Sequence, residues 1–353
     1  MNLVQLGWND FFQADFVTRF SDEWTVGRVI GQGKNVYKLI TNSGDAHGKL
    51  SGKFQYDTMD QADLPVVGDW VVLRQTDGDP LAIIQGVLNR KSVFSRNAPG
   101  DNVEEQVIAA NIDTVFLVNA LNNDFNVRRI ERYLTLVWES GANPVIILTK
   151  ADLCTDADEK LREVEDIAIG VPIHLTSSVT NQGIGDIKHY FTEGQTIGLL
   201  GSSGVGKSTL TNILLGHDQQ SVNTIRQDDK GRHTTTSRDL ILLEKGMIID
   251  TPGMRELQLW SSDEGLSQTF QDIKDLEMAC KFRDCTHDRE PGCAVKGAIE
   301  DGTLRSDRYE SYLKLNREIE YLTNSTAYIK NKEHKMKQYR HQASKNRQLK
   351  KRN

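Results

Sequence analysis

The sequence has 353 residues, of which 38% are hydrophobic and 26% are charged, a balance typical of soluble globular proteins. The length predicts roughly two to three domains. No apolar run approaches the roughly 20 residues that a membrane-spanning helix needs. Residues 1–5 do not begin a secretory signal. A cytoplasmic protein without a membrane partner is therefore expected.

The net charge of −6 conceals an asymmetry along the chain. Residues 329–353 contain ten Lys and Arg against one Glu, a charge of +9, which leaves −15 on the remainder. A basic tail on an acidic body suggests a polyanion as the partner. We expect the tail, residues 326–353, to be disordered or to fold on RNA.

Residues 24–97, which follow a lead of residues 1–23 without a clear pattern, predict a small barrel. Short runs with strand character are separated by glycines, and no segment has the helical period. About five such strands in about 70 residues are typical of an OB-fold. The clearest runs are residues 25–30, 36–40, 69–73 and 81–84.

Aromatic and basic side chains are interleaved along this barrel, and on an OB-fold surface such a mixture binds nucleic acid. For each residue singly, the favoured interpretation is that the aromatic ring fills the core and the cation is solvated. Residues 90–96 predict a strand that leaves the barrel with its cations free to meet phosphates. The interleaved residues are Tyr37, Phe54, Tyr56, Trp70, Arg28, Lys38, Lys49, Lys53 and Arg74.

Residues 101–260 alternate between apolar strands and amphipathic helices. This alternation predicts a parallel sheet with helices on both faces, an α/β domain. The predicted strands are residues 114–118, 144–148, 172–175, 196–200, 239–243 and 247–249. The predicted helices are residues 127–138, 158–167, 184–191 and 210–215.

One loop in this domain matches G-x-x-x-x-G-K-[ST] at every fixed position. It lies between a predicted strand and a predicted helix, the context that a phosphate-binding loop requires. Glycines let backbone N–H groups point at phosphate oxygens, and the helix N-terminus adds partial positive charge. Lys207 can reach the terminal phosphates, and Ser208 can ligate Mg²⁺. The loop is Gly201-Ser202-Ser203-Gly204-Val205-Gly206-Lys207-Ser208-Thr209.

Three further polar motifs directly follow predicted strands, where ligands bind in open α/β sheets. Each motif is weak by itself, but together with the phosphate loop they are strong evidence for a nucleotide site. The motifs are Thr149-Lys150-Ala151-Asp152, Thr176-Ser177-Ser178 and Asp250-Thr251-Pro252-Gly253.

Three cysteines and a histidine cluster within fourteen residues after this domain: Cys280, Cys285, His287 and Cys293. Three thiolates and an imidazole suit one tetrahedral, structural zinc ion per chain. The alternative is a set of reduced cysteines in a small helical core. Apolar residues at helical spacing over 308–322 add a helix, so residues 261–325 predict a mostly helical zinc-binding module.

The four nucleotide motifs resemble the guanine-nucleotide signature of translation-factor-related GTPases, but their order differs. In the usual order the phosphate loop comes first, whereas here the TKAD and TSS motifs precede it and DTPG comes last. The GTPase domain is therefore expected to be circularly permuted. This order, with a barrel before it and a Cys/His cluster after it, resembles the ribosome small subunit-dependent GTPase A family over about residues 24–322.

The resemblance implies a role for each motif. Asp152 would accept hydrogen bonds from guanine and Lys150 would cover the base, while Thr149 replaces the commoner Asn. Asp250 would hold Mg²⁺ through water, and the Gly253 N–H would sense the γ-phosphate. The remaining residues implied in nucleotide binding are Ala151, Thr176, Ser177 and Ser178.

Residues 231–236, Gly-Arg-His-Thr-Thr-Thr, would form the first switch, where a threonine completes Mg²⁺ coordination. Thr235 is taken for this role, with Thr234 and Thr236 left open. Met254 stands where many GTPases have a water-orienting Gln. His233 is the candidate to replace it, and a solvated loop histidine is the alternative.

The resemblance implies an enzyme that hydrolyses GTP to GDP and phosphate and binds the small (30S) ribosomal subunit and its rRNA. It would promote late maturation of that subunit or release of assembly factors, with Zn²⁺ and Mg²⁺ as cofactors, and act as a monomer. The alternative is a non-ribosomal regulatory GTPase whose zinc module binds a protein. A third hypothesis is a purely structural RNA-binding protein, and the intact phosphate loop argues against it.

Overall fold

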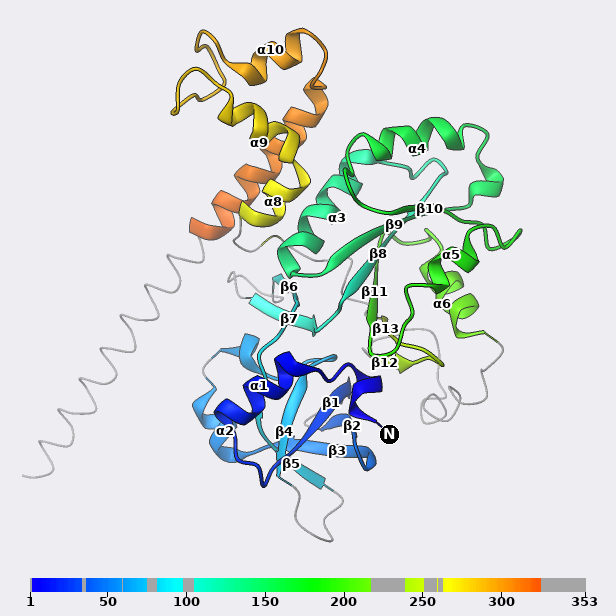
Figure 1. Ribbon diagram of the computed structural model, residues 1–353, viewed down its shortest axis with the longest axis vertical. Helices are drawn as coiled ribbons and strands as arrows, with labels where there is room; N and C mark the ends of the chain where they lie inside the picture. The colour runs from blue at the N-terminus through cyan, green and yellow to red at the C-terminus, as the bar shows by residue number, and fades with distance from the viewer. Residues whose placement is uncertain are drawn as a thin grey trace, which may run out of the picture.

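The computed structural model describes residues 2–33, 36–58, 60–74, 81–97, 105–216, 239–250, 259 and 263–324. A strand barrel, a sheet with helices on both faces and a helical module follow one another along the chain (Figure 1). We call the last two the central domain and the C-terminal module. None of the helices in the described ranges is long and apolar enough to cross a membrane.

The lead of the chain packs onto the barrel, although its sequence carries no clear pattern. A 3-10 turn, η1 (Leu3–Leu6), is followed by α1 (Asp10–Arg19), which begins where the Asn9 side chain accepts a hydrogen bond from the Phe11 N–H. The rings of Trp8 and Phe12 lie 4.9 and 5.9 Å from the Trp70 ring. The lead therefore extends the apolar core of the barrel.

Five strands form the closed barrel that the sequence predicts. β1 pairs with β2, β2 with β3 and β5 with β4, all antiparallel, while β3 and β5 run parallel. Pairing of β4 with β1 closes the ring of strands, and α2 (Gly52–Asp57) lies between β3 and β4. This is the arrangement of an OB-fold. The strands are β1 (Thr25–Gln32), β2 (Tyr37–Thr41), β3 (Gly44–Leu50), β4 (Trp70–Arg74) and β5 (Leu81–Val87).

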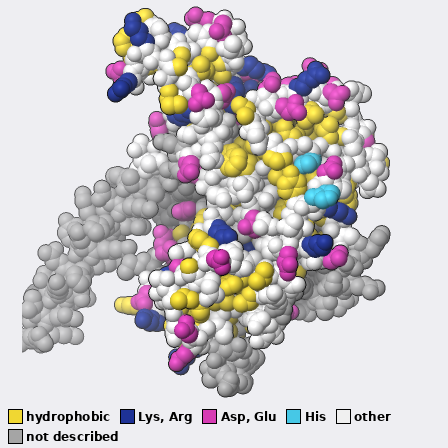
Figure 2. All heavy atoms as spheres, in the orientation of Figure 1, with side chains coloured by type: hydrophobic (Ala, Val, Ile, Leu, Met, Phe, Trp, Pro, Cys, Tyr) yellow, Lys and Arg dark blue, Asp and Glu magenta, His cyan; other side chains and the backbone are white. Residues whose placement is uncertain are grey.

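The barrel divides its aromatic residues between core and surface. Tyr37 and Trp70 are buried in the core, as favoured for each aromatic residue singly, whereas Tyr56 is 87% exposed. On the face drawn in Figure 2, acidic and basic side chains are interspersed over the barrel. The exposed cations are Lys38, Lys49, Lys53 and Arg74.

Arg28 corrects the expectation of a solvated cation, because it is buried between the barrel and the central domain. Its Nη2 donates to the Asn111 carbonyl at 3.0 Å and to the Thr196 hydroxyl at 2.8 Å, and its Nη1 donates to the Leu6 carbonyl. Burial lowers the pKa of Arg28 to about 10, against the opposing effect of the Asp113 and Asp69 carboxylates. It therefore remains charged at neutral pH and joins strand β1 to the neighbouring domain.

Arg90 also departs from expectation, since its guanidinium is not free. Its Nε and Nη2 donate to the two oxygens of the buried Asp69 carboxylate at 2.8 and 2.7 Å. The strand expected over residues 90–96 is observed as β6 (Val93–Asn97), which pairs with β7 (Glu105–Ala110) in a separate two-stranded ribbon. Arg90 thus stabilises the exit from the barrel, because a buried carboxylate needs a paired cation.

The central sheet has the strand order β10-β9-β8-β11-β13-β12. All pairs among these six strands are parallel, as predicted, except β12 with β13. β12 also pairs antiparallel with β1, so the sheet continues into the barrel. The phosphate-loop strand β11 lies between strands that precede it in sequence and strands that follow it. The strands are β8 (Thr114–Ala120), β9 (Asn143–Thr149), β10 (Ile173–Leu175), β11 (Thr196–Leu200), β12 (Asp239–Leu242) and β13 (Met247–Asp250).

Helices cover both faces of this sheet. On one face α3 (Val127–Ser140) buries Ile130 and Leu134 against β8 and β9, with α4 (Ala157–Glu165) beside it. On the other face, buried side chains of α5 (Ile184–Lys188) and α6 (Lys207–Leu215) pack in a second cluster. The α3 helix begins at Asn126, whose side chain caps the Arg129 N–H, and ends at Gly141, which has a φ of 85°.

The C-terminal module contains α8 (Asp263–Thr269), α9 (Gln271–Met278) and α10 (Ala294–Glu300), and residues 306–324 are helical. The predicted helix over 308–322 is therefore confirmed. α8 crosses α3 closely: a Cβ added at Gly265 would lie 2.5 Å from the Thr135 carbonyl oxygen. The C-terminal module is thus docked directly on the central domain.

Candidate nucleotide site and metal centre

The phosphate loop joins β11 to α6 at the carboxyl edge of the sheet. Its three glycines all have positive φ: 157° at Gly201, 78° at Gly204 and 105° at Gly206. A Cβ at Gly201 would lie 2.2 Å from the Val118 carbonyl oxygen, so this position requires glycine. Val205 is buried and anchors the loop. The backbone is therefore preshaped to curl around an anion.

Lys207 lies across this loop. Its Nζ donates to the carbonyl oxygens of Gly201 and Ser202, both at 2.6 Å. Ser203, Ser208 and Thr209 are exposed at the mouth of the loop. A bound phosphate would offer the ammonium group charged acceptors in place of the two carbonyls.

The TKAD motif follows β9 and contacts the phosphate loop. The Thr149 hydroxyl donates to the Val205 carbonyl at 2.6 Å. Lys150 has a φ of 61°, and its Nζ donates to the Gly204 carbonyl at 2.9 Å. Thr149 therefore binds the phosphate loop through its hydroxyl, and the uncommon residue at this position has a defined partner.

The TSS motif supports the other end of TKAD. One Asp152 carboxylate oxygen accepts a hydrogen bond from the Ser177 hydroxyl at 2.6 Å, and the Ala151 N–H donates to the Thr176 carbonyl at 3.1 Å. The Ser177 oxygen in turn accepts from the N–H groups of residues 179 and 180, both at 3.2 Å. Ser177 is buried, while Asp152 and Ser178 are exposed. The structure thus places TKAD between TSS and the phosphate loop.

Some of the predicted site residues belong to segments that the structure does not describe. His233, Thr234, Thr235, Thr236, Gly253 and Met254 lie outside the described residues, as does the side chain of Asp250. The Asp250 backbone ends β13, which pairs in parallel with β11. The backbone of Asp250 therefore belongs to the same carboxyl edge as the phosphate loop.

One residue at the site is absent from the sequence expectations. Arg129 lies in the first turn of α3, and its Nη1 donates to the Ser202 hydroxyl at 2.8 Å and to the Asp124 carboxylate at 2.7 Å. The sequence pattern of α3 predicts only its apolar face. The available signal was a run of cations at the start of a helix that directly follows β8.

The four metal-ligand candidates converge. The ligand atoms of Cys280, Cys285, His287 and Cys293 all lie within 4.8 Å of one another. Cys280 Sγ lies 3.9 Å from Cys293 Sγ and 3.6 Å from His287 Nδ1, and His287 Nδ1 lies 3.3 Å from Cys293 Sγ. Around tetrahedral zinc these separations would be about 3.8 Å for S to S and about 3.6 Å for S to N. The residues therefore fit a four-coordinate metal centre.

Local interactions hold this cluster in shape. His287 has a φ of 58°, and its Nε2 lies 3.7 Å from the Glu277 carboxylate, which can orient the ring. The Glu290 carboxylate accepts hydrogen bonds from the Thr286 hydroxyl and N–H and from the N–H groups of residues 288 and 289. These bonds, the Thr286 hydroxyl first, hold the pKa of Glu290 at about 2. The loop between the ligands is therefore preorganised.

Comparisons with known proteins agree with this architecture. A family model described as RsgA GTPase matches residues 87–260, and one described as 50S ribosome-binding GTPase matches residues 196–346. A Lactiplantibacillus plantarum protein named small ribosomal subunit biogenesis GTPase RsgA 2 is 50% identical over 91% of this chain and 90% of its own length.

Two solved structures share the fold. YjeQ from Thermotoga maritima is 30% identical with a TM-score of 0.63, over 84% of this chain and 98% of that one. YloQ, described as a circularly permuted GTPase, is 28% identical with a TM-score of 0.62, over 85% of this chain and 96% of that one. The chain therefore hydrolyses GTP through a circularly permuted domain and belongs to the RsgA GTPase family.

Proposed function

We propose that this GTPase binds the small (30S) ribosomal subunit and promotes its late maturation or the release of assembly factors. The observation that supports this most directly is 50% identity over nearly the whole chain to a protein named for small-subunit biogenesis. The barrel, the C-terminal module and the basic tail are the proposed rRNA contacts. The proposed units are a lead of residues 1–23, then residues 24–97, 101–260, 261–325 and 326–353. The proposed place of action is the cytoplasm.

At the nucleotide site, the base and the phosphates of GTP would each be bound by a different motif. The Asp152 carboxylate, held at one oxygen by Ser177, would accept hydrogen bonds from the guanine N1–H and amino group, which adenine cannot supply. The N–H groups of residues 203–208 would cradle the β-phosphate, and Lys207 would leave its loop carbonyls for the terminal oxygens. Lys150 would lie against the base.

Two cations complete the proposal. Ser208, Asp250 and one of Thr234–Thr236, taken as Thr235, would hold magnesium, which neutralises charge on the β- and γ-phosphates. Cys280, Cys285, His287 and Cys293 would hold zinc; all four positions carry protein ligands, so its role is structural. The Gly253 N–H would contact the γ-phosphate, and His233 would position the attacking water.

Phosphate release from GTP, with and without purified 30S subunits, tests the proposal. We expect slow intrinsic turnover that rises on addition of 30S subunits and is lost in Lys207→Ala. Co-sedimentation with 30S subunits should weaken as KCl rises, because each rRNA phosphate contact releases counterions. Turnover unaffected by 30S subunits, together with no co-sedimentation, would instead favour a non-ribosomal regulatory GTPase.

A further inference from the structure

Ser202 of the phosphate loop has two contacts with different origins. Its carbonyl oxygen accepts a hydrogen bond from Lys207 Nζ at 2.6 Å, and its hydroxyl accepts one from Arg129 Nη1 at 2.8 Å. The first contact must change when phosphate binds, because Lys207 then turns to the terminal phosphate oxygens. Ser202 therefore contacts both Lys207, which responds to nucleotide binding, and Arg129 in the first turn of α3.

Arg129 is fixed at the start of α3. Its Nη1 also donates to the Asp124 carboxylate at 2.7 Å, and its backbone N–H is capped by the Asn126 side chain at 2.9 Å. Only 29% of the Arg129 side chain is exposed. A guanidinium held by a carboxylate donates strong, directional hydrogen bonds, so a displacement of Ser202 acts on the first turn of α3.

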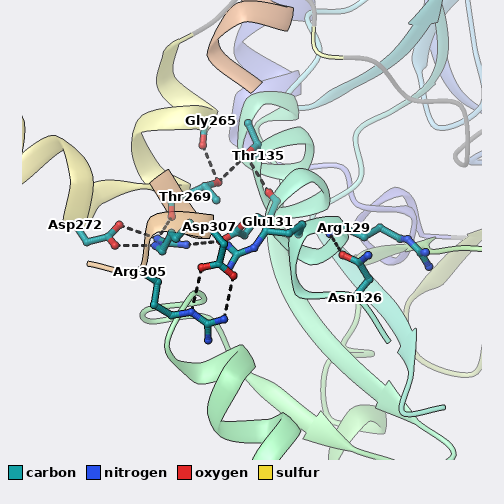
Figure 3. Close-up of polar contacts among 11 residues, drawn as sticks. Asn126, Arg129, Glu131, Thr135, Gly265, Thr269, Asp272, Arg305 and Asp307 are labelled. Carbon is teal, nitrogen blue, oxygen red and sulfur yellow. Dashed lines mark hydrogen bonds and ion pairs between the residues drawn. The ribbon is translucent and has the colours of Figure 1, made fainter. Parts of the chain in front are cut away.

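The same helix carries the C-terminal module on its other side. The fully buried Glu131 carboxylate pairs with Arg308 at 2.8 Å, and Arg132 binds the Glu318 carboxylate through two bonds of 2.6 and 2.7 Å. The hydroxyls of Thr135 and Thr269 lie 3.1 Å apart. Figure 3 shows Arg129 and Glu131 pointing to opposite sides of α3.

We propose that Arg129 is a positioning residue that couples the phosphate loop to the C-terminal module through α3. Binding of nucleotide then strengthens the docking of the C-terminal module, and a docked module in turn favours the nucleotide-bound loop, since coupling free energies are reciprocal. The proposal depends on GTP binding by the phosphate loop and not on the ribosome, so it can fail independently of the proposed function.

A second route between the two sites exists along the chain. The DTPG motif is followed within about ten residues by α8, and residues 251–258 lie outside the described residues. If that segment alone carried the coupling, Arg129 would be dispensable. Arg129→Gln separates the routes, because it removes the charge and shortens the reach to Ser202 without changing the segment after Gly253.

Hydrogen exchange of the full chain, with and without a saturating non-hydrolysable GTP analogue, measures the coupling. In the wild type we expect the analogue to slow amide exchange in α8, α9 and residues 306–324 by about fivefold or more. Arg129→Gln should lose this protection and Arg129→Lys should restore part of it. Arg162→Gln, an exposed arginine of α4, is the matched control and should behave as wild type.

Binding of a fluorescent GTP analogue confirms saturation and supplies the reciprocal measurement. Arg129→Gln should lower the affinity for the GTP analogue by about the factor by which it reduces protection of the C-terminal module from amide exchange. It should affect kcat at saturating GTP less than KM. If Arg129→Gln does not fold, Ser202→Ala removes the other partner and should give the same loss. Equal protection in variant and wild type, or no protection in the wild type, would overturn the proposal.

Discussion

Replacing Arg308 by methionine should loosen the C-terminal module from the central domain. The Arg308 side chain is 5% exposed and donates to Asp272 through two bonds of 2.7 Å, to Glu131 at 2.8 Å and to the Thr269 carbonyl at 3.0 Å. Methionine fills the space of the aliphatic part of the Arg308 side chain. It leaves the buried Glu131 carboxylate with Arg128 as its remaining described partner. One Glu131 oxygen, Oε2, already has no hydrogen-bond partner among the described residues. Removing one member of a buried ion pair costs about 3–5 kcal/mol.

Arg305→Met provides the matched control for this substitution. Arg305 belongs to the same stretch of chain and pairs with Asp307 at 3.0 Å (Figure 3). In contrast to Arg308, 57% of its side chain is exposed. Exposed pairs contribute about 0–1 kcal/mol. Amide exchange in α8 and α9 should therefore accelerate by about a hundredfold or more in Arg308→Met and by less than about tenfold in Arg305→Met. Similar rates in the two variants would refute the assignment of Arg308 as the buried anchor.

Four further changes test the site. Asp152→Asn should lower the affinity for GTP by about tenfold or more and allow xanthosine triphosphate to bind in competition assays. Equal affinity of the wild type for ATP and GTP would contradict this. Cys285→Ser should reduce the zinc content and the midpoint temperature of thermal unfolding. Wild-type protein that carries about zero zinc without chelator treatment would contradict a structural zinc site. His233→Ala should lower the 30S-stimulated rate with GTP binding nearly intact; an unchanged rate would move the role to a ribosomal group or to the Thr234–Thr236 backbone. Deleting residues 329–353 should weaken 30S binding equally with GDP and with a GTP analogue, and loss of the nucleotide difference alone would contradict this.

Elements with a local cause were predictable from the sequence. The alternation of apolar strands and amphipathic helices gave the central sheet, because burial on both faces imposes that pattern. The phosphate loop was recognisable because its glycines are needed for φ values of 78° to 157° and its lysine for charge. The Cys/His cluster was recognisable because metal chemistry restricts both residue type and spacing.

Contacts between distant segments were not predictable. Arg28, Arg90 and Arg129 are all cations in unremarkable surroundings in the sequence, and each binds partners supplied by another part of the fold. Arg28 reaches Thr196, which is 168 residues away, and Arg129 reaches Ser202, which is 73 residues away. Composition suggests a solvated side chain at such positions, and only the packing of distant segments gives these cations their fixed partners.

The affinity for 30S subunits with GDP and with a non-hydrolysable GTP analogue tests the central claim most directly. The chain is proposed to bind the subunit as a nucleotide-controlled switch, so the γ-phosphate must change that affinity. We predict tighter binding with the analogue by about 1–3 kcal/mol, measured at one fixed KCl concentration. Equal affinity with the two nucleotides would contradict the account.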